Sequence, residues 1–228
     1  YNIFISGATS TGKTTFLNVL ADYIPKTERV ITIEDSAELQ IHGIENLVRM
    51  EVRQADGDGV SNVTLRDLIR TSLRMRPDRI IVGEVLGEEA LDMIQSMNTG
   101  HDGSLSTGHA NSPQDMLSRL ETMALFASDI PIQAIRKQIA SSIDIIVQLE
   151  RLRDRSRRVT AIAEVLDCTE DAYILNPIFE FHEQDNLVME SSSYGDIPER
   201  VVGQLERTGY HLMHRRKLHA AALESAEI

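Results

Sequence analysis

Short β-branched runs alternate with amphipathic helical patterns through the first two thirds of the chain. The apolar run at residues 29–34, for example, follows a helical segment whose Phe16, Leu17 and Leu20 fall on one face. The predicted strands are residues 2–6, 29–34, 79–85, 104–107 and 144–150, and the predicted helices are 13–23, 64–75, 88–97, 113–124 and 131–142. This order predicts an α/β fold with a mostly parallel sheet flanked by helices.

The last third of the chain has a different pattern. Two β-rich segments, 158–166 and 172–181, follow each other without a helix between them, which favours an antiparallel pair. Polar residues follow His182, and helical patterns return at 198–208 and 212–226. We therefore expect three parts, which are an α/β core (1–150), an antiparallel β extension of that core (151–182), and a linker with C-terminal helices (183–228).

Composition and charge exclude several functions. The 228 residues carry a formal net charge of −12, no Trp and only 4% aromatic residues, so we expect no nucleic-acid partner. No apolar run approaches the roughly 18 residues that cross a bilayer, and no leader is visible, so we expect a cytoplasmic protein. The chain does not begin with Met, which indicates a fragment of a longer protein. Cys168 is the single cysteine, which excludes an internal disulfide and a multi-cysteine metal site.

A phosphate-binding loop follows the first predicted strand. Its sequence has the form G-x-x-x-x-G-K-T and precedes a predicted helix, the arrangement in which backbone N–H groups and the helix N-terminus surround a phosphate. Lys13 can reach the β- and γ-phosphates, and the Thr14 hydroxyl can bind Mg²⁺. We expect ATP and Mg²⁺ as cofactors, with nucleotide contacts from Gly7, Ala8, Thr9, Ser10, Thr11, Gly12, Lys13, Thr14 and Thr15.

Acidic residues and a histidine follow the other predicted strands. Glu34 ends the second strand with Glu38 close behind, Glu84 ends an apolar run, and His109 follows the next short strand. Ligands of open α/β sheets bind beyond the carboxyl ends of the strands, and ATP hydrolysis needs one acid near the metal and one group to orient or deprotonate water. The alternatives are solvated strand-end carboxylates and a hydrogen-bonded structural histidine.

At this point four segments resemble a known family. The segments ITIEDSAEL (31–39), MRPDRIIVGEV (75–85), ALDMIQSMNTGHDGSLSTGHANSP (90–113) and SRLETM (118–123) resemble the type II/IV secretion ATPase superfamily. Within it they are most similar to the CpaF/TadA branch, which serves tight-adherence (Flp) pili. The resemblance covers residues 2–166 approximately, with several motifs in the same order.

The resemblance implies a RecA-like P-loop NTPase core and a homo-hexameric ring. Such a ring hydrolyses ATP to drive an inner-membrane platform of a pilus or secretion system, so that membrane association is peripheral and through partners. By resemblance, Glu34 is the water-activating residue, Glu84 holds Mg²⁺ through water, and His109 senses the γ-phosphate. The catalytic set is thus Glu34, Glu84 and His109, and the metal set is Thr14 and Glu84.

Four departures from the family pattern qualify these expectations. The family's N-terminal domain, which supplies arginines to the site, is absent, so this fragment is expected to hydrolyse ATP poorly. Leu86 stands where many relatives have arginine, and the four-cysteine zinc site of some relatives cannot form. Gly108 stands where a larger apolar residue is expected, which predicts a looser His109.

Basic clusters leave open alternatives. The spacing of four residues places Arg66, Arg70 and Arg74 on one helix face. They could form a solvated basic stripe, or one or more of them could face the nucleotide of a neighbouring subunit. The segment 151–158 (RLRDRSRR) is either an exposed turn or an interface or acidic-lipid contact. The methionines of two helices are expected in the core. The alternatives to a ring motor are a nucleic-acid translocase on the same core and a nucleotide-binding scaffold without turnover.

Overall fold

The computed structural model describes residues 1–55, 61–184 and 200–221, and within them one mixed sheet runs through the molecule. The strand order is β3-β2-β4-β5-β1-β6-β7-β8-β9, with parallel pairing from β3 to β6 and antiparallel pairing from β6 to β9. Its strands are β1 (Ile3–Gly7), β2 (Arg29–Glu34), β3 (Asn46–Glu51), β4 (Arg79–Val82), β5 (Leu105–Gly108), β6 (Ile145–Arg151), β7 (Arg157–Cys168), β8 (Tyr173–Glu183) and β9 (Gly203–Arg207).

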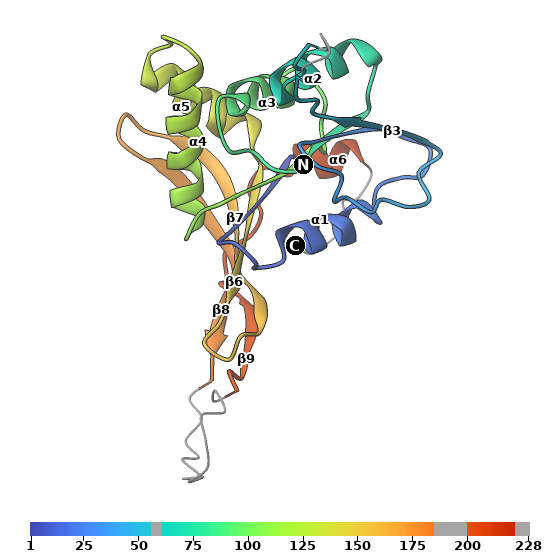
Figure 1. Cartoon of the computed structure of the whole chain (residues 1–228). Coiled ribbons are helices and arrows are strands. Elements are labelled where there is room, and N and C mark those ends of the chain that lie inside the picture. The colour runs from blue at the N-terminus through green and yellow to red at the C-terminus, as the bar shows by residue number, and fades with distance from the viewer. Residues whose placement is uncertain (56–60, 185–199, 222–228) are drawn as a thin grey trace.

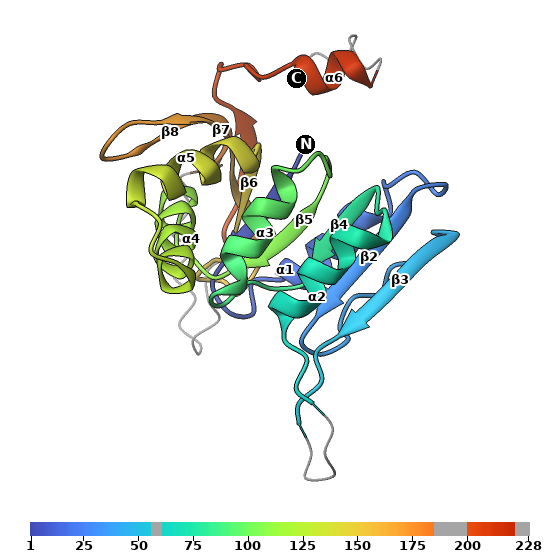
Figure 2. The ribbon, with the colours of Figure 1, turned by 90° about the horizontal axis from the view of Figure 1, so that it is seen from above.

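Helices cover both faces of the parallel part, as Figures 1 and 2 show. They are α1 (Lys13–Ala21), α2 (Leu65–Ser72) with a 3₁₀ turn (Leu73–Met75), α3 (Glu89–Met97), α4 (Pro113–Ala127) and α5 (Ile132–Ser142). The short α6 (Arg216–Ala220) lies apart from these faces and packs its Leu218 near Ile178. Alternate strand residues point to opposite faces. Phe4 therefore packs in the core beneath α2 to α5, while Ile5 packs against α1. The predicted mostly parallel sheet flanked by helices is confirmed.

The helices begin and pack as the sequence predicts. Thr64 caps α2 in a reciprocal capping box with Asp67, and Ser112 caps α4 in front of Pro113. The methionines of α3 and α4 are buried, as expected, at positions 93, 97, 116 and 123. Ile135 and Ile139 of α5 are buried, whereas Ile132, the first residue of the helix, is exposed at the surface.

Two predictions for the C-terminal part are wrong. Residues 203–207, inside the predicted helix 198–208, form β9, because pairing with the exposed edge of β8 overrides a weak local helix preference. The predicted helix over 212–226 is reduced, within the described residues, to Arg216–Ala220. Residues 198–199 and 222–226 of these two predictions lie outside the described residues. None of the helices in the described ranges has the length and apolarity of a membrane span.

Two strands also differ from their predicted bounds. β3 was not predicted, because it lies at the sheet edge and its residues are exposed or half-buried and do not form an apolar run. β4 ends at Val82 and not at Val85. There the backbone changes partner, since the Gly83 N–H donates to Ile33 of β2 while the Val85 N–H donates to Thr107 of β5. Glu84 therefore lies in a loop just beyond the strand.

Candidate functional site

The phosphate loop joins β1 to α1 along a tightly packed path. A side chain at Gly7 would collide with the Leu149 carbonyl of β6, and Gly12 has φ +95, so both glycines are required by the backbone. The Thr11 hydroxyl donates to the Ala8 carbonyl at 2.8 Å and is buried, whereas residues 8–10 are exposed. The loop therefore presents its tip to solvent directly before the N-terminus of α1, where N–H groups are free to bind an anion.

The Lys13 side chain folds back across this loop. Its Nζ donates to the carbonyl oxygens of Gly7 and Ala8 at 3.1 and 3.2 Å, and only 7% of the residue is exposed. Burial lowers the pKa of Lys13, and the Glu84 carboxylate, whose Oε1 lies 3.8 Å from Nζ, opposes that shift. A cation is thus fixed at the mouth of the loop, where phosphate oxygens would bind.

His109 connects Lys13 to Glu84. Lys13 Nζ donates to His109 Nδ1 at 3.3 Å, and because an ammonium only donates, the imidazole proton belongs on Nε2. Nε2 in turn lies 2.7 Å from Glu84 Oε1, to which it donates. Burial and then the Lys13 charge lower the pKa of His109, with Glu84 opposing them, so the neutral imidazole is favoured. These three side chains, from α1 and from the loops after β4 and β5, form a connected cluster.

Gly108 does not loosen His109. A Cβ at this position would lie 2.9 Å from both Phe4 Cε1 and Met116 Cε, so the glycine lets β5 pack closely under α4. The expectation of a loose histidine is wrong, because His109 is held through both ring nitrogens.

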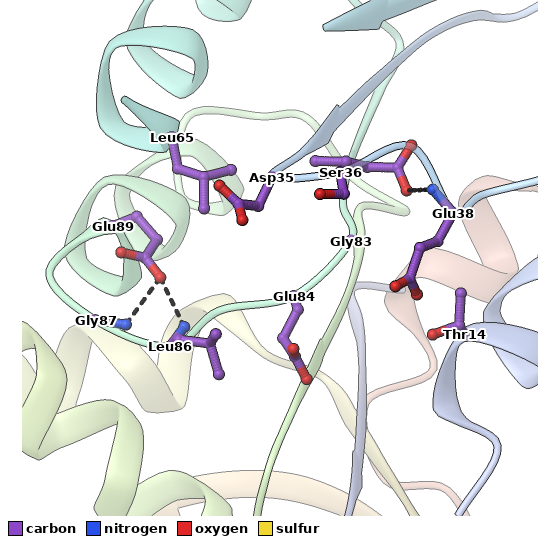
Figure 3. A pocket seen from close by; sticks show the side chains of 11 residues that line it. Thr14, Asp35, Ser36, Glu38, Leu65, Gly83, Glu84, Leu86, Gly87 and Glu89 are labelled. Atoms are coloured by element: carbon purple, nitrogen blue, oxygen red, sulfur yellow. Dashed lines mark hydrogen bonds between the residues drawn. The ribbon is translucent and has the colours of Figure 1, made fainter. Parts of the chain in front are cut away.

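Beside this cluster lies a pocket rich in carboxylates (Figure 3). Five of its eleven lining residues are acids and none is a cation, and the set is Thr14, Glu34, Asp35, Ser36, Glu38, Leu65, Gly83, Glu84, Leu86, Gly87 and Glu89. The structure therefore brings Glu34 and Glu84 together with the Thr14 hydroxyl, as the strand-end argument predicted. Leu86, at the position where the family resemblance led us to expect an arginine, is 63% exposed at the rim.

Glu34 and Glu38 lie in different environments within the pocket. Glu34 is only 4% exposed, and its Oε1 accepts hydrogen bonds from the backbone N–H groups of Glu38 and Leu39 at 2.9 and 2.8 Å. Glu38 is exposed, and Figure 3 shows its side chain extending toward Thr14. Sequence reasoning gave Glu38 no role, although its spacing of four residues from Glu34 in a polar segment was a usable signal.

Glu89 supports the loop that carries Glu84. Its Oε1 accepts from the N–H groups of Leu86 and Gly87 at 2.6 and 2.8 Å, which fixes the turn between β4 and α3 (Figure 3). This role was not predicted.

The donor atoms of the pocket suit a hard cation. Among the described residues, no three His, Cys, Asp or Glu side chains are arranged to hold a metal by themselves. The hydroxyl of Thr14 and the carboxylates of Glu38 and Glu84 line one pocket. Proteins typically bind Mg²⁺ through one or two side-chain oxygens together with water and substrate phosphate, and the donor atoms of this pocket fit that pattern.

The arginines of α2 face their own chain. Arg66 and Arg70 each donate to the buried Asp92 of α3 at 2.7 Å, and Arg66 also pairs with Glu88. The hypothesis that these two face a neighbouring nucleotide is therefore not supported, and they are not a merely solvated stripe. Arg74 is exposed.

Comparison with known proteins agrees with this geometry. The sequence matches the family described as Type II/IV secretion system protein over residues 1–192. A Mycobacterium tuberculosis protein named for conjugal transfer is 38% identical over 159 residues, covering 70% of this chain and 45% of that protein. The type IV secretion system protein PtlH of Bordetella pertussis is 36% identical over 159 residues, covering 68% of this chain and 47% of PtlH.

A solved structure extends the similarity to the fold. The VirB11 ATPase of the Brucella suis type IV secretion system, in complex with sulphate, superposes with a TM-score of 0.65 at 32% identity, covering 72% of this chain and 48% of that chain. The present chain spans about half the length of the curated relatives it matches. The core is RecA-like, and the chain belongs to the type II/IV secretion system protein family.

Proposed function

We propose that this chain is the nucleotide-binding part of an ATPase that hydrolyses Mg·ATP. The observation that carries the proposal is the Lys13–His109–Glu84 cluster at the mouth of the phosphate loop, with contacts of 2.7 to 3.8 Å. A loop that only bound nucleotide would need Lys13 but not a carboxylate and a neutral imidazole joined to it. The relative whose structure contains sulphate, an anion shaped like phosphate, supports the same assignment.

The residues divide the chemistry between them. The N–H groups of residues 7–15 surround the β-phosphate, and Lys13 exchanges its carbonyl partners for β- and γ-phosphate oxygens. The neutral His109 donates from Nε2, so it can transfer that hydrogen bond from Glu84 to the γ-phosphate. Mg²⁺ would be held by the Thr14 hydroxyl and, through water, by Glu84. It would stabilise the negative charge of the phosphate oxygens during hydrolysis.

We assign the attacking water to Glu38, whereas the sequence prediction gave it to Glu34. Two backbone N–H groups occupy one oxygen of Glu34, and its burial leaves it little access to the pocket. The same bonds fold residues 35–39 so that the Glu38 carboxylate extends toward Thr14. In this assignment Glu34 positions the loop, and Glu38 orients or deprotonates the water.

At the level of the whole protein we propose a ring motor. Membership of the family and the names of its relatives support a role in a secretion system. The homo-hexameric ring, its place at the cytoplasmic side of a membrane and its action on an inner-membrane platform rest on the motif resemblance. The narrower assignment to the CpaF/TadA branch of tight-adherence pili rests on the motif resemblance alone.

A nucleic-acid translocase on the same core is the second candidate. The relative named for conjugal transfer favours it, whereas a net charge of −12 and the absence of Trp oppose it. Stimulation of turnover by DNA or RNA, falling steeply with salt, would identify a translocase.

The test of the proposed function is phosphate release by the full-length protein. Lys13→Ala should abolish nucleotide binding, and Glu84→Gln should abolish turnover while ATP binding remains. Glu45→Gln, an exposed carboxylate outside the pocket, is the matched control and should leave both unchanged. A full-length Lys13→Ala protein that hydrolysed ATP at the parental rate would refute the assignment, and a parental protein that bound ATP without releasing phosphate would identify a scaffold.

A further inference from the structure

The basic turn between β6 and β7 lies beside the phosphate loop. In the sheet, β1 lies between β5 and β6, and Gly7 at the end of β1 is paired with Leu149 of β6. The cluster of Lys13, Glu84 and His109 approaches the loop from the side of β4 and β5. The β6–β7 turn approaches it from the opposite side.

Arg157 is the residue of this turn that reaches the loop. Its Cδ lies 3.5 Å from the position that a Cβ would take on Gly12, so its side chain passes over the loop directly before α1. Arg157 is exposed, and its directly opposed partner in the antiparallel register is Arg151, also exposed. Within residues 1–55, 61–184 and 200–221, no ion pair or side-chain hydrogen bond involves either guanidinium.

Two like charges on directly opposed strand positions destabilise a sheet. The other arginines nearby have different surroundings, since Arg153 pairs with Glu183 and Arg158 lies opposite Glu150. Arg151 and Arg157 thus concentrate positive charge at one side of an anion-binding loop, and no carboxylate of the described residues pairs with them. An anion placed between them and the loop would remove this repulsion.

We propose that Arg157, with Arg151 beside it, binds the α-phosphate of the nucleotide. This inference rests on the proposed function, which places the γ-phosphate against Lys13, His109 and Glu84. A phosphate chain that starts there and follows the N–H groups of the loop leaves it on the other side of β1, next to Gly12. The cationic side chain of an arginine can donate charge-assisted hydrogen bonds to phosphate oxygens at that position.

The experiment measures binding of ATP and ADP to the full-length protein by titration calorimetry. Arg157→Gln should weaken both nucleotides by about tenfold, the effect of losing one charge-assisted hydrogen-bonded contact. Arg157→Lys should recover most of that affinity, because a positive charge at this point suffices for a phosphate. Arg155→Gln removes the same charge two residues away in the same turn and should bind like the parent. Thermal unfolding of each variant confirms that the fold is kept.

The outcomes separate this inference from the proposed function. Equal affinities of Arg157→Gln and Arg155→Gln would overturn the inference while the parent still binds ATP. Failure of Arg157→Lys to recover affinity would also overturn it, since it would indicate that the guanidinium stacks on the base. A parent that bound neither nucleotide would refute the proposed function and this inference together.

Discussion

Exchanging Glu34 and Glu38 for glutamine, one at a time, tests the division of roles within the pocket most directly. Both changes remove one negative charge and keep nearly the same shape. Glu38→Gln removes the group that we assign to the attacking water, so turnover should fall by about 10²- to 10⁴-fold, the contribution typical of a positioned general base. Binding of ATP should change little, because the phosphates are held by the loop and Lys13.

The expected effect of Glu34→Gln follows from its two hydrogen bonds. In the parent, the N–H groups of Glu38 and Leu39 donate to a carboxylate oxygen of Glu34 at 2.9 and 2.8 Å. The amide oxygen of a glutamine can still accept both hydrogen bonds. Hydrogen bonds to charged groups contribute about 1.5–3 kcal/mol, and neutral ones about 1 kcal/mol. The change therefore loses about 1 kcal/mol per bond, or about 2 kcal/mol together. If the whole loss of about 2 kcal/mol raised the activation free energy of hydrolysis, turnover would fall by about 30-fold at most.

The assay is steady-state phosphate release at saturating Mg·ATP, with the affinity for ATP measured separately. Glu45→Gln serves as the control for loss of a surface carboxylate near the sheet edge. The reasoning predicts a large loss for Glu38→Gln and a small one for Glu34→Gln. The reverse order, with Glu34→Gln inactive and Glu38→Gln close to the parent, would refute it and return the water-activating role to Glu34.

Three further predictions concern the surroundings of the site. The pKa of His109 in the folded protein lies below its ordinary value of 6.5, so the stability that the neutral imidazole provides is complete above pH 6.5 and is lost as pH falls through the folded pKa. The free energy of unfolding, measured with denaturant and plotted against pH, should therefore differ in slope between the parent and His109→Gln only on the acid side. Asp92→Asn should lower the free energy of unfolding by about 2 kcal/mol, because Arg66 and Arg70 lose the charge of a buried partner while water partly screens the two arginines. Nucleotide affinity, measured by calorimetric titration, should be unchanged. Gly108→Ala should lower the free energy of unfolding by about 1–3 kcal/mol through contact with Phe4, measured by thermal unfolding; an unchanged midpoint would contradict the close packing described here.

Much of the site was predictable because its chemistry follows from strand ends. The phosphate loop is a local motif, and its glycines, Lys13 and Thr14 need no information from elsewhere in the chain. Glu84 and His109 are distant from it in sequence, but all three follow parallel strands, whose carboxyl ends meet at one edge of a sheet. Strand order therefore suffices to predict the proximity of Glu84 to Lys13 and His109 that the structure shows.

The details that were missed depend on contacts made only after folding. Glu34 and Glu38 both line the pocket, and their different exposure goes with two backbone hydrogen bonds to Glu34 within a five-residue loop. The edge strand β3 has no apolar run, and β9 forms where local preference favours a helix, because β8 offers it an unpaired edge. Arg157 reaches the loop only because β7 returns antiparallel to β6.

If the chain hydrolyses ATP as proposed, the charge distribution of the pocket would make turnover depend on groups from outside the pocket. Five carboxylates line the pocket and no lining residue is a cation, while Lys13 already balances Glu84. Bringing a triphosphate against this surface is unfavourable unless Mg²⁺ and a further positive group accompany it. Leu86 lies exposed at the rim and brings no charge to the pocket, so the further positive group would have to come from outside the pocket lining. A neighbouring subunit of the proposed ring is a source that would bring the charge only when the ring closes, and hydrolysis would then be coupled to assembly.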